Sequence, residues 1–314
     1  VYHETGMLVK QIEDEISVAN MAVGSMHMGA RTMIATSGGG FDLMTETVSL
    51  AGITETPLVC VVAQRPGPGT GLPTWTSASD LNIAVYSGHG EYARCVVAAH
   101  DVMSCYTVTQ NAFNIAEKYQ IPVMILTEKQ IAESIFQIDK LPKDLPIQRD
   151  IVKGRDLEKI ESSDRYKITK TGVSKRWLPG SCDAVFDANG DEHLPDGSLT
   201  EDALSAKEMY DKRIRKEEYL LENLPEPELF GSSDPDILFV GWGSVKNSMI
   251  DVIELSDKKI AYLHYEYIYP VKTKVFMEMA KKTKKLVLIE NNATGQLGNL
   301  LTSKSGILFN NKLL

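Results

Sequence analysis

Three short, uninterrupted apolar runs constrain the fold more than any other feature of the first 140 residues. They are RTMIATS at 31–37, PLVCVVA at 57–63 and IPVMILT at 121–127. A strand with one face in water alternates apolar and polar residues, whereas a strand covered on both faces is apolar throughout. Stretches with helical periodicity accompany these runs, so the sequence predicts β/α units built on a parallel sheet.

Two helices with apolar stripes are predicted beside these strands. Residues 101–119 begin at Asp101, whose side chain is suited to accept hydrogen bonds from the first free N–H groups of a helix. Residues 11–28 place apolar side chains at the spacing of a helix that packs against a core, namely Ile12, Ile16, Ala19, Val23 and Met26. Strands and helices together predict a first α/β domain over residues 1–138.

The pattern changes twice after this domain. Residues 139–228 are polar and rich in Lys, Asp, Pro and Gly, so they are predicted to form an excursion and linker. A charged helix at 201–223 is expected to lie mostly on the surface. A second β/α series then predicts a smaller α/β domain over 229–314, with strands in DILFVGWGS (236–244), KIAYLHYEYIYP (259–270) and KLVLIENNATGQLG (285–298).

Composition excludes several classes of partner. A net charge of −9 over 314 residues argues against a nucleic-acid surface, and the basic run KKTKK at 281–285 is interpreted as a solvated helix end. No apolar run reaches the ~18 residues of a membrane span, and the start VYHETGMLVK lacks the shape of a signal peptide. We therefore expect a cytoplasmic protein that binds neither membrane nor nucleic acid. The chain lacks an initiator methionine and is expected to be a fragment.

The four cysteines do not form a metal-binding pattern. Cys60, Cys95, Cys105 and Cys182 are scattered with no C-x-x-C pair, so an iron–sulfur cluster or structural zinc would have to lie on another chain. Such usage is typical of a reduced cytosol. The run NGDEHLPDG at 189–197 is similar to a Gly-Asp element that holds magnesium and diphosphate, but its polar, strandless surroundings favour a surface turn. We expect no metal ligands in this chain.

Glu15 is the first candidate for catalysis. In QIEDEISVAN it lies three residues after Ile12 and four before Ala19, which puts its carboxylate within the apolar stripe of the predicted helix. Burial raises the pKa of a carboxyl group unless a cation or donor compensates, so such a group suits proton transfer. The alternative is a flanking residue whose carboxylate reaches water or caps a neighbouring loop.

Two glycine-rich turns supply further candidates. ATSGGGFDLMTE at 35–46 is predicted to form strand, triple-glycine turn and helix, a geometry in which Ser37, Gly38 and Gly39 can aim N–H groups at a cofactor anion. The glycines equally suit a tight turn with no ligand. His89 in YSGHGE is a candidate donor to a substrate oxygen, although a lone histidine is more often structural.

The loop AQRPGPGTGLPTW at 63–75 carries one arginine where a strand ends. Its three prolines lack N–H groups, so the loop is not a phosphate cradle; they fix φ and lower the entropy lost on ordering. Ligands of α/β proteins bind at the carboxyl ends of the strands. Arg65 is therefore a candidate clamp for a small carboxylate through two charge-assisted hydrogen bonds, with a structural salt bridge as the alternative.

The stretches QIEDEISVANMAVGS, TSGGGFDLMTE and AQRPGPGTGLPTW together closely resemble the α subunit of 2-oxoacid:ferredoxin oxidoreductases, particularly the 2-oxoglutarate-type branch. The likeness extends through SGHGE, AEKYQIPVMILT, GWGS and ENNATGQLGNL and covers most of residues 5–305. It implies an α/β fold with a thiamine-diphosphate-binding, pyrimidine-type parallel-sheet domain. A second, smaller α/β domain similar to the C-terminal domain of transketolase would follow it.

The resemblance also implies roles for single residues. Glu15 matches the carboxylate that hydrogen-bonds N1′ of the cofactor's aminopyrimidine, and Arg65 matches the arginine that grips the carboxylate of the 2-oxoacid. Such a glutamate favours the imino tautomer of the ring, whose nitrogen removes the proton from C2 of the thiazolium. A YPITPSS-like segment, whose threonine touches substrate in the family, would lie upstream of Val1, and both it and a fused γ domain are missing from this sequence.

The implied activity is oxidative decarboxylation of a 2-oxoacid to an acyl-CoA, with electrons passed to ferredoxin. Thiamine diphosphate would be shared with a β subunit that carries Mg²⁺ and a [4Fe-4S] cluster, and coenzyme A would be the co-substrate. 2-Oxoglutarate is favoured, with pyruvate or a branched oxoacid as alternatives. Two other interpretations stay open: a transketolase- or E1-β-like thiamine enzyme chain, and a non-catalytic subunit that only assembles a complex.

Overall fold

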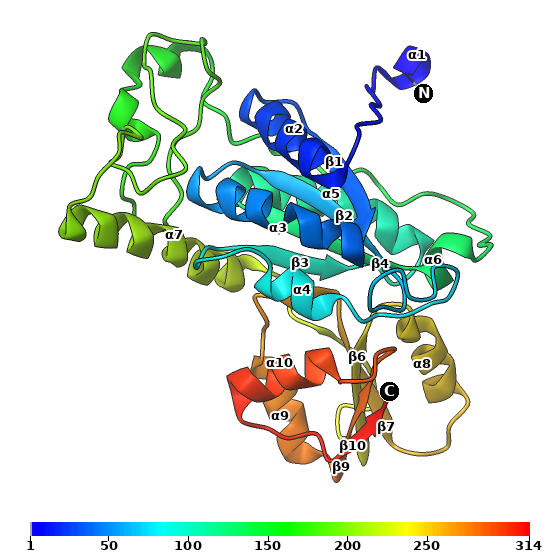
Figure 1. Cartoon of the computed structure of the whole chain (residues 1–314). Helices are drawn as coiled ribbons and strands as arrows, with labels where there is room; N and C mark the ends of the chain where they lie inside the picture. The colour runs from blue at the N-terminus through cyan, green and yellow to red at the C-terminus, as the bar shows by residue number, and fades with distance from the viewer. Residues whose placement is uncertain (1) are drawn as a thin grey trace.

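The computed structural model describes residues 2–314, with side chains from Glu4 onward. This part of the chain contains two five-stranded sheets (Figure 1). The first has the order β1-β2-β4-β3-β8 and consists of β1 (Met33–Ser37), β2 (Leu58–Gln64), β4 (Pro122–Glu128), β3 (Cys95–Ala98) and β8 (Tyr267–Tyr269). Its first four strands are parallel, and β8 pairs antiparallel with β3.

The second sheet has the order β10-β9-β6-β7-β5. It consists of β10 (Asn311–Leu313), β9 (Lys285–Ile289), β6 (Ile237–Trp242), β7 (Ile260–Tyr265) and β5 (Glu228–Gly231). Four of these strands are parallel, and β5 pairs antiparallel with β7. The predicted α/β fold built on parallel sheets is therefore confirmed.

The three continuous apolar runs form β1, β2 and β4, as predicted. In β4, Met124 and Leu126 belong to one core cluster, while Val123 and Ile125 belong to another on the opposite face. Both faces are therefore covered over residues 123–126, which leaves no position there for a polar side chain. The expectation of two covered faces is wrong for β1, because it is the edge strand of the sheet and Met33 and Ala35 are exposed. The strand β3 has four residues and was too short to be recognised from its sequence.

Helices cover both faces of the first sheet (Figure 1). One face packs against α2 (Glu15–His27), α3 (Gly38–Ile53) and α4 (Leu81–Tyr86), and the other against α5 (Val102–Tyr119). The predicted cap of α5 is confirmed, because the Ser104 N–H donates to Asp101 Oδ1 at 2.7 Å. The helix α2 begins later than predicted, since the Ser17 N–H donates to Asp14 Oδ1 at 2.7 Å and Asp14 is the residue that caps it. Two short helices are α1 (Tyr2–Thr5) and α6 (Lys129–Glu133).

The run at 259–270, predicted to be one strand, forms two strands in different sheets. After β7 ends at Tyr265, β8 crosses to the first sheet, where Tyr269 lies opposite Val96. Ile268 in β8 is fully buried in the core cluster that both units share. The first sheet is therefore completed by a strand from the C-terminal part of the chain.

The helix α7 (Ala203–Asn223) is more buried than predicted. Lys212 and Lys216 are 0% and 2% exposed, and both pair with the buried carboxylate of Glu55. Leu220 packs into the core cluster on the α5 side of the sheet. The prediction of a mostly surface helix was wrong because long aliphatic stems cover the core while their charged ends meet one internal carboxylate.

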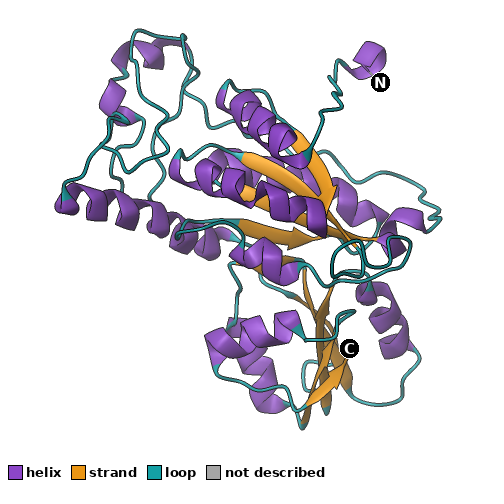
Figure 2. Cartoon of the chain, in the orientation of Figure 1, coloured by secondary structure: helices purple, strands orange, loops and turns teal. Residues whose placement is uncertain are grey.

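Residues 139–202 contain little regular structure apart from the 3₁₀ helices Gly154–Lys159 and Ser162–Asp164 (Figure 2). The run at 189–197 does make a turn, in which the Gly197 N–H donates to the Leu194 carbonyl at 2.9 Å. Its His193 is fully buried, with its ring centroid 4.3 Å from that of Tyr166. The surface-turn prediction was wrong for this histidine, which anchors the excursion to the first unit.

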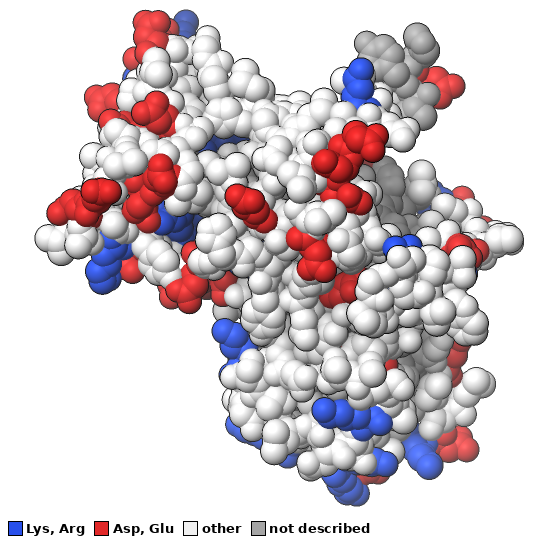
Figure 3. All heavy atoms as spheres, viewed as in Figure 1, with Lys and Arg blue, Asp and Glu red and all other residues white. Residues whose placement is uncertain are grey.

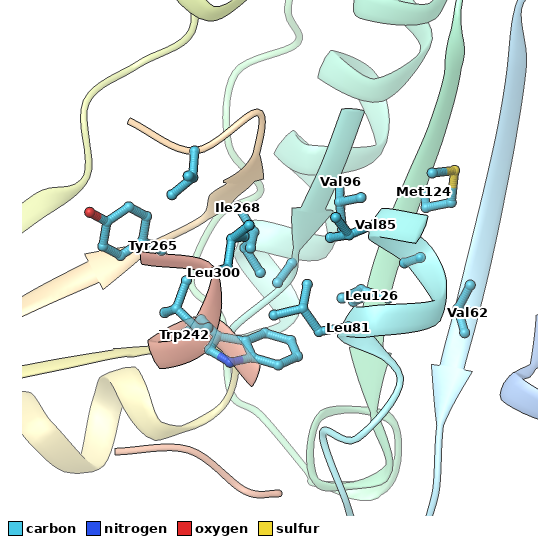
Figure 4. Close-up of a cluster of buried hydrophobic side chains, with 14 of the residues drawn as sticks. Val62, Leu81, Val85, Val96, Met124, Leu126, Trp242, Tyr265, Ile268 and Leu300 are labelled. Atoms are coloured by element: carbon cyan, nitrogen blue, oxygen red, sulfur yellow. The ribbon is translucent and has the colours of Figure 1, made fainter. Parts of the chain in front are cut away.

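The second unit carries α8 (Val245–Glu254), α9 (Lys274–Lys282) and α10 (Gln296–Ser305) and shares a continuous apolar core with the first. Figure 4 shows Trp242 and Leu300 of this unit beside Leu81 of α4. The KKTKK run ends α9 with exposed lysines, as expected. Among the described residues, no helix combines the length and the apolar character needed to cross a membrane.

Candidate active site

The candidate residues gather at the carboxyl edge of the first sheet. The parallel neighbours β1 and β2 end on this edge at Ser37 and Gln64. The triple-glycine turn follows β1, and the loop of Arg65 follows β2. Glu15 is the first residue of α2, which packs on α3. Three segments that are far apart in the sequence therefore meet where α/β proteins bind ligands.

Glu15 lies on the face of α2 that packs inward. Its side chain is half-buried, and Ala19, Ala22 and Met26 on the following turns of the same face are fully buried. The predicted stripe is right for Ala19 and Met26 but wrong for Ile16, which is 50% exposed. Since each helical residue turns by about 100°, a face that contains residues 15, 19, 22 and 26 excludes residue 16.

Gly40 allows Glu15 to approach the first turn of α3. A Cβ at this position would lie 2.8 Å from Glu15 Oε1 and 2.1 Å from Thr36 Oγ1, well inside van der Waals contact. The carboxylate of Glu15 therefore rests against a position that only glycine can occupy. It also lies beside the N-terminal turn of a helix, where the dipole favours negative charge.

Asp80 is a second acidic group at the same turn. A Cβ at Gly38 would lie 2.5 Å from Asp80 Oδ2. That oxygen is buried and has no hydrogen-bond partner among the described residues. Burial raises the pKa of Asp80, Asp42 raises it further, and Arg65 opposes the shift. A buried, unpartnered carboxyl group beside a candidate cofactor turn is suited to meet a ligand.

Arg65 is half-buried at the base of the Pro/Gly loop, near enough to Asp80 to affect its pKa. The loop folds back on itself, because the Leu72 N–H donates to the Pro66 carbonyl at 3.0 Å. Gly71 has φ +55°, and a Cβ there would lie 1.8 Å from that carbonyl oxygen, so the turn requires glycine. Among the described residues Arg65 makes no ion pair within 4.0 Å, and its guanidinium is available to a ligand.

The second unit fixes the segment that carries Asp80. The Ala78 N–H donates to the Asn291 carbonyl at 2.7 Å. Gln296 Nε2 donates to the Ser79 carbonyl at 2.7 Å. Both partners belong to the ENNATGQLG stretch that follows β9, so this stretch sets the path of the chain into α4.

A buried carboxylate orders that stretch in turn. Glu290 accepts hydrogen bonds from the backbone N–H groups of Leu297 at 3.1 Å and Gly298 at 3.0 Å. It also accepts from Trp242 Nε1 at 2.9 Å and Asn292 Nδ2 at 2.7 Å. The GWGS and ENNATGQLG stretches therefore form one hydrogen-bonded cluster beneath the Asp80 segment.

Glu128 at the end of β4 joins the two units directly. Its carboxylate accepts from the Ser244 N–H at 2.9 Å and the Ser244 hydroxyl at 2.8 Å. Burial raises the pKa of Glu128, and the hydrogen bonds from Ser244 oppose that shift. Gly243, with φ +67°, is required here because a Cβ would lie 2.3 Å from Glu128 Oε1. The carboxylate occupies the N-terminus of α8, so this helix end is already satisfied.

His89 does not lie with this group. It is exposed in the loop that precedes β3, on the amino side of the sheet, and its carbonyl accepts from the Ser49 hydroxyl at 2.9 Å. Ser49 lies nine residues along α3 from Gly40, a rise of about 14 Å. The structure therefore brings together Glu15, Arg65 and the glycine turn but not His89.

The site can supply a carboxylate acceptor, free backbone N–H groups and a guanidinium. In the part of the chain that the structure describes, no three His, Cys, Asp or Glu side chains are arranged to hold a metal ion. Burial raises the pKa of the Cys60 thiol to about 12, so it is an inert core group. Acidic side chains gather over α2 and α3 on the face shown in Figure 3.

Residues 2–198 match the family described as "Pyruvate flavodoxin/ferredoxin oxidoreductase, thiamine diP-bdg". The chain belongs to this family. The matched range contains Glu15, the glycine turn and Arg65, which are the residues that meet at the carboxyl edge of the first sheet.

Relatives and solved structures agree with the assignment to the pyruvate flavodoxin/ferredoxin oxidoreductase family. The chain is 33% identical over 98% of its length to "2-oxoacid:ferredoxin oxidoreductase 1, subunit alpha" of Sulfurisphaera tokodaii, covering 49% of that protein. It is 31% identical over 92% of its length to "2-oxoglutarate synthase subunit KorA" of Methanothermobacter thermautotrophicus, covering 76%. The 2-oxoglutarate:ferredoxin oxidoreductase of Magnetococcus marinus, solved with 2-oxoglutarate, coenzyme A and succinyl-CoA bound, superposes with TM-score 0.90 at 30% identity, over 99% of this chain and 54% of that one.

The chain spans about half the length of the 2-oxoacid:ferredoxin oxidoreductase α subunits that it matches. A split-gene transketolase, solved as an inactive β4 tetramer, superposes with TM-score 0.51 at 12% identity, over 96% of this chain and 72% of that one. The likeness to transketolase therefore concerns the fold alone, which confirms the predicted fold class.

Proposed function

We propose that the chain is the α subunit, or part of it, of a thiamine-diphosphate-dependent oxidoreductase that decarboxylates 2-oxoglutarate to an acyl-CoA and passes electrons to ferredoxin. The observation that carries the proposal is the Glu15 carboxylate resting against Gly40, on the same sheet edge as Arg65. Relatives named for 2-oxoacid or 2-oxoglutarate oxidation support the reaction class.

The aminopyrimidine end of thiamine diphosphate fits this edge. Glu15 offers a carboxylate acceptor in a cradle that a Cβ at Gly40 would fill. The diphosphate end lacks a counterpart, because the described residues hold no metal-ligand group. When bound, thiamine diphosphate supplies the carbanion and the electron sink. Mg²⁺, diphosphate and [4Fe-4S] ligands then belong to a partner β subunit.

The chain's own residues perform two tasks in this scheme. Glu15, in the first turn of α2, would accept a hydrogen bond from N1′ of the aminopyrimidine and share its proton. Arg65 binds the carboxylate of the oxoacid and orients the bond to be broken. The preorganised loop that carries Arg65 lowers the entropy lost when substrate binds.

A partner polypeptide is expected on an exposed apolar face beside Glu15. Exposed apolar side chains occur on α2, on the edge strand β1 and at the start of α3, namely Ile16, Met21, Met28, Met33 and Leu43, each 45–56% exposed. Exposed large apolar side chains near a site are typical of an interaction surface. Cofactor bound at Glu15 would then lie between the two chains. The free cysteines agree with a cytoplasmic location for the complex.

The Glu15→Gln variant tests the proposal in the complex reconstituted with the partner subunit. We expect turnover to fall by about 10²–10⁴-fold, because the proton shared with N1′ is lost, while assembly is unchanged. Glu13→Gln is the matched control, since Glu13 is exposed two residues before the helix starts. Near-wild-type turnover by Glu15→Gln would reject the catalytic role and favour a non-catalytic assembly subunit.

A further inference from the structure

A cavity lies away from the catalytic edge, between the end of α5 and the excursion. Its volume is about 750 Å³. Five cationic side chains line it, namely Lys118, Lys153, Lys159, Lys175 and Arg176, against the two acidic side chains of Asp150 and Asp156. This balance contrasts with the net charge of −9 of the whole chain.

Arg176 is the buried element of this cavity. Its side chain is 3% exposed, and Nη2 donates to Glu117 Oε1 at 3.0 Å. Nη1 donates to the Met26 carbonyl at 3.3 Å. Its Nε is buried and has no hydrogen-bond partner among the described residues. A buried guanidinium N–H without an acceptor is costly, and the positive charge of this side chain lies at the wall of the cavity.

The positive charge behind the cavity is not balanced by the protein. Among the described residues, the carboxylate of Glu117 pairs with three arginines. Its Oε2 lies 2.9 Å from Arg31 Nε, and its Oε1 lies 3.0 Å from both Arg149 Nε and Arg176 Nη2. Of the lysines that line the cavity, Lys153 and Lys159 form no ion pair in the described part of the chain. The cavity therefore offers several cations to a ligand with more than one negative charge.

The remaining lining indicates which kind of anion fits. Ile151, Val152, Ile160 and Val173 are half-buried and give the cavity an apolar side suited to a flat ring. The carboxylates of Asp150 and Asp156 can accept hydrogen bonds from sugar hydroxyl groups. An inorganic anion would use the lysines but would leave the apolar side empty.

We propose that this cavity binds an adenosine phosphate, with the phosphates on Lys153, Lys159 and Arg176 and the base on the apolar side. The site is separate from the catalytic edge. Lys118 and Gln120 lie just before β4 begins at Pro122, whereas Glu128 ends that strand on the catalytic side. Seven strand residues span about 20 Å. Bound oxoacid should therefore not compete with the adenosine phosphate.

Calorimetric titration of the purified protein with ATP tests the proposal. We expect the Lys153→Glu/Lys159→Glu variant to bind ATP about tenfold or more weakly, because it reverses two unpaired, exposed charges. Lys281→Glu/Lys282→Glu, on exposed lysines of α9, is the matched control and should bind ATP like the wild type. Equal affinity in the two variants would overturn the proposal.

Further titrations distinguish two possible ligands. Coenzyme A and ATP both carry an adenosine phosphate, so the one that binds more tightly is identified as the ligand of the cavity. Binding of either should require Lys153 and Lys159. Hydrogen exchange with ATP bound should protect residues 150–160 and 173–176. Protection only at residues 37–40 would place the nucleotide at the catalytic edge and reject the cavity. Inorganic phosphate that binds as tightly as ATP would reject the role of the apolar side.

Discussion

Replacing Gly40 with alanine tests the geometry of the site without changing a charged group. The new Cβ would lie 2.1 Å from Thr36 Oγ1 and 2.8 Å from Glu15 Oε1. These distances fall 1.3 Å and 0.6 Å short of the 3.4 Å at which ordinary contact begins. Thr36 and Glu15 must both move, and overpacking of this kind costs about 1–3 kcal/mol of stability.

The effect on catalysis should follow from the displacement of Glu15. A misplacement of about 1 Å in a catalytic group can cost about 100-fold in rate. Because the displacement required here is 0.6 Å, we expect turnover of the reconstituted complex to fall about 10–100-fold. The KM for the oxoacid should change little, since Arg65 lies on another loop. Steady-state oxidation of 2-oxoglutarate with a one-electron acceptor measures both constants, and urea unfolding measures stability.

Two variants isolate the cause. Gly39→Ala places the same methyl group one residue earlier in the same helix, where the nearest atom is the Gly69 carbonyl oxygen at 3.9 Å, and it should retain wild-type turnover. Thr36→Ala/Gly40→Ala removes the 2.1 Å contact and leaves the 2.8 Å contact with Glu15, so stability should recover more than turnover. If Gly40→Ala is as active as Gly39→Ala, the Glu15 carboxylate does not work from this position.

Three further predictions concern charged groups. Arg65→Lys should raise the KM for the oxoacid about 10–100-fold with unchanged affinity for thiamine diphosphate, because a lysine cannot make two parallel hydrogen bonds to a carboxylate. The pKa of Asp80 is raised in the folded protein, so ionisation of this carboxyl group lowers the unfolding free energy as the pH rises above 3.8. Asp80→Asn should therefore raise the unfolding free energy by about 0.5–1 kcal/mol at pH 7 but not at pH 3. Lys212 and Lys216 hold the pKa of Glu55 well below 4.5 against the effect of burial. Glu55→Gln should therefore lower the free energy of unfolding in urea by about 3–5 kcal/mol at pH 7. The difference from wild type should shrink as the pH falls below 4.5.

Each of these predictions has a contrary result. Loss of cofactor binding in Arg65→Lys would mean that the residue holds the cofactor rather than the substrate. A lower unfolding free energy of Asp80→Asn at pH 7 would show that the ionised carboxylate is stabilising. A Glu55→Gln variant as stable as wild type would show that Lys212 is already uncharged; burial lowers its pKa to about 7, and Glu55 opposes that shift.

The sequence predicts the sheets because burial on both faces leaves a local signature. The apolar runs of β2 and β4 identify them without knowledge of their neighbours. A helix cap such as Asp101 is equally local. The burial of Lys212 leaves no local signature. A lysine next to other charged residues is predicted to be solvated unless the carboxylate of Glu55 that faces it is known.

The site was predicted only in part for the same reason. Three successive glycines look alike in the sequence, and Gly40 is distinguished from its neighbours only by contact with Glu15 and Thr36. Asp80 was missed because its burial depends on a segment held from more than 200 residues away, through the hydrogen bond between Ala78 and Asn291. His89 shows the opposite error, since a glycine-flanked histidine resembles a site residue but lies beside Ser49.

The link between Asn291 and Ala78 also indicates why the second unit matters to a site built on the first sheet. Glu290 orders the stretch that holds the Asp80 segment, and it is itself held by Trp242 of β6. The apolar core continues across the two units, and β8 completes the first sheet, so the first sheet is not formed by its own segment alone. The position of Asp80 beside Gly38 and Arg65 is thus set through a rigid junction rather than through a flexible loop.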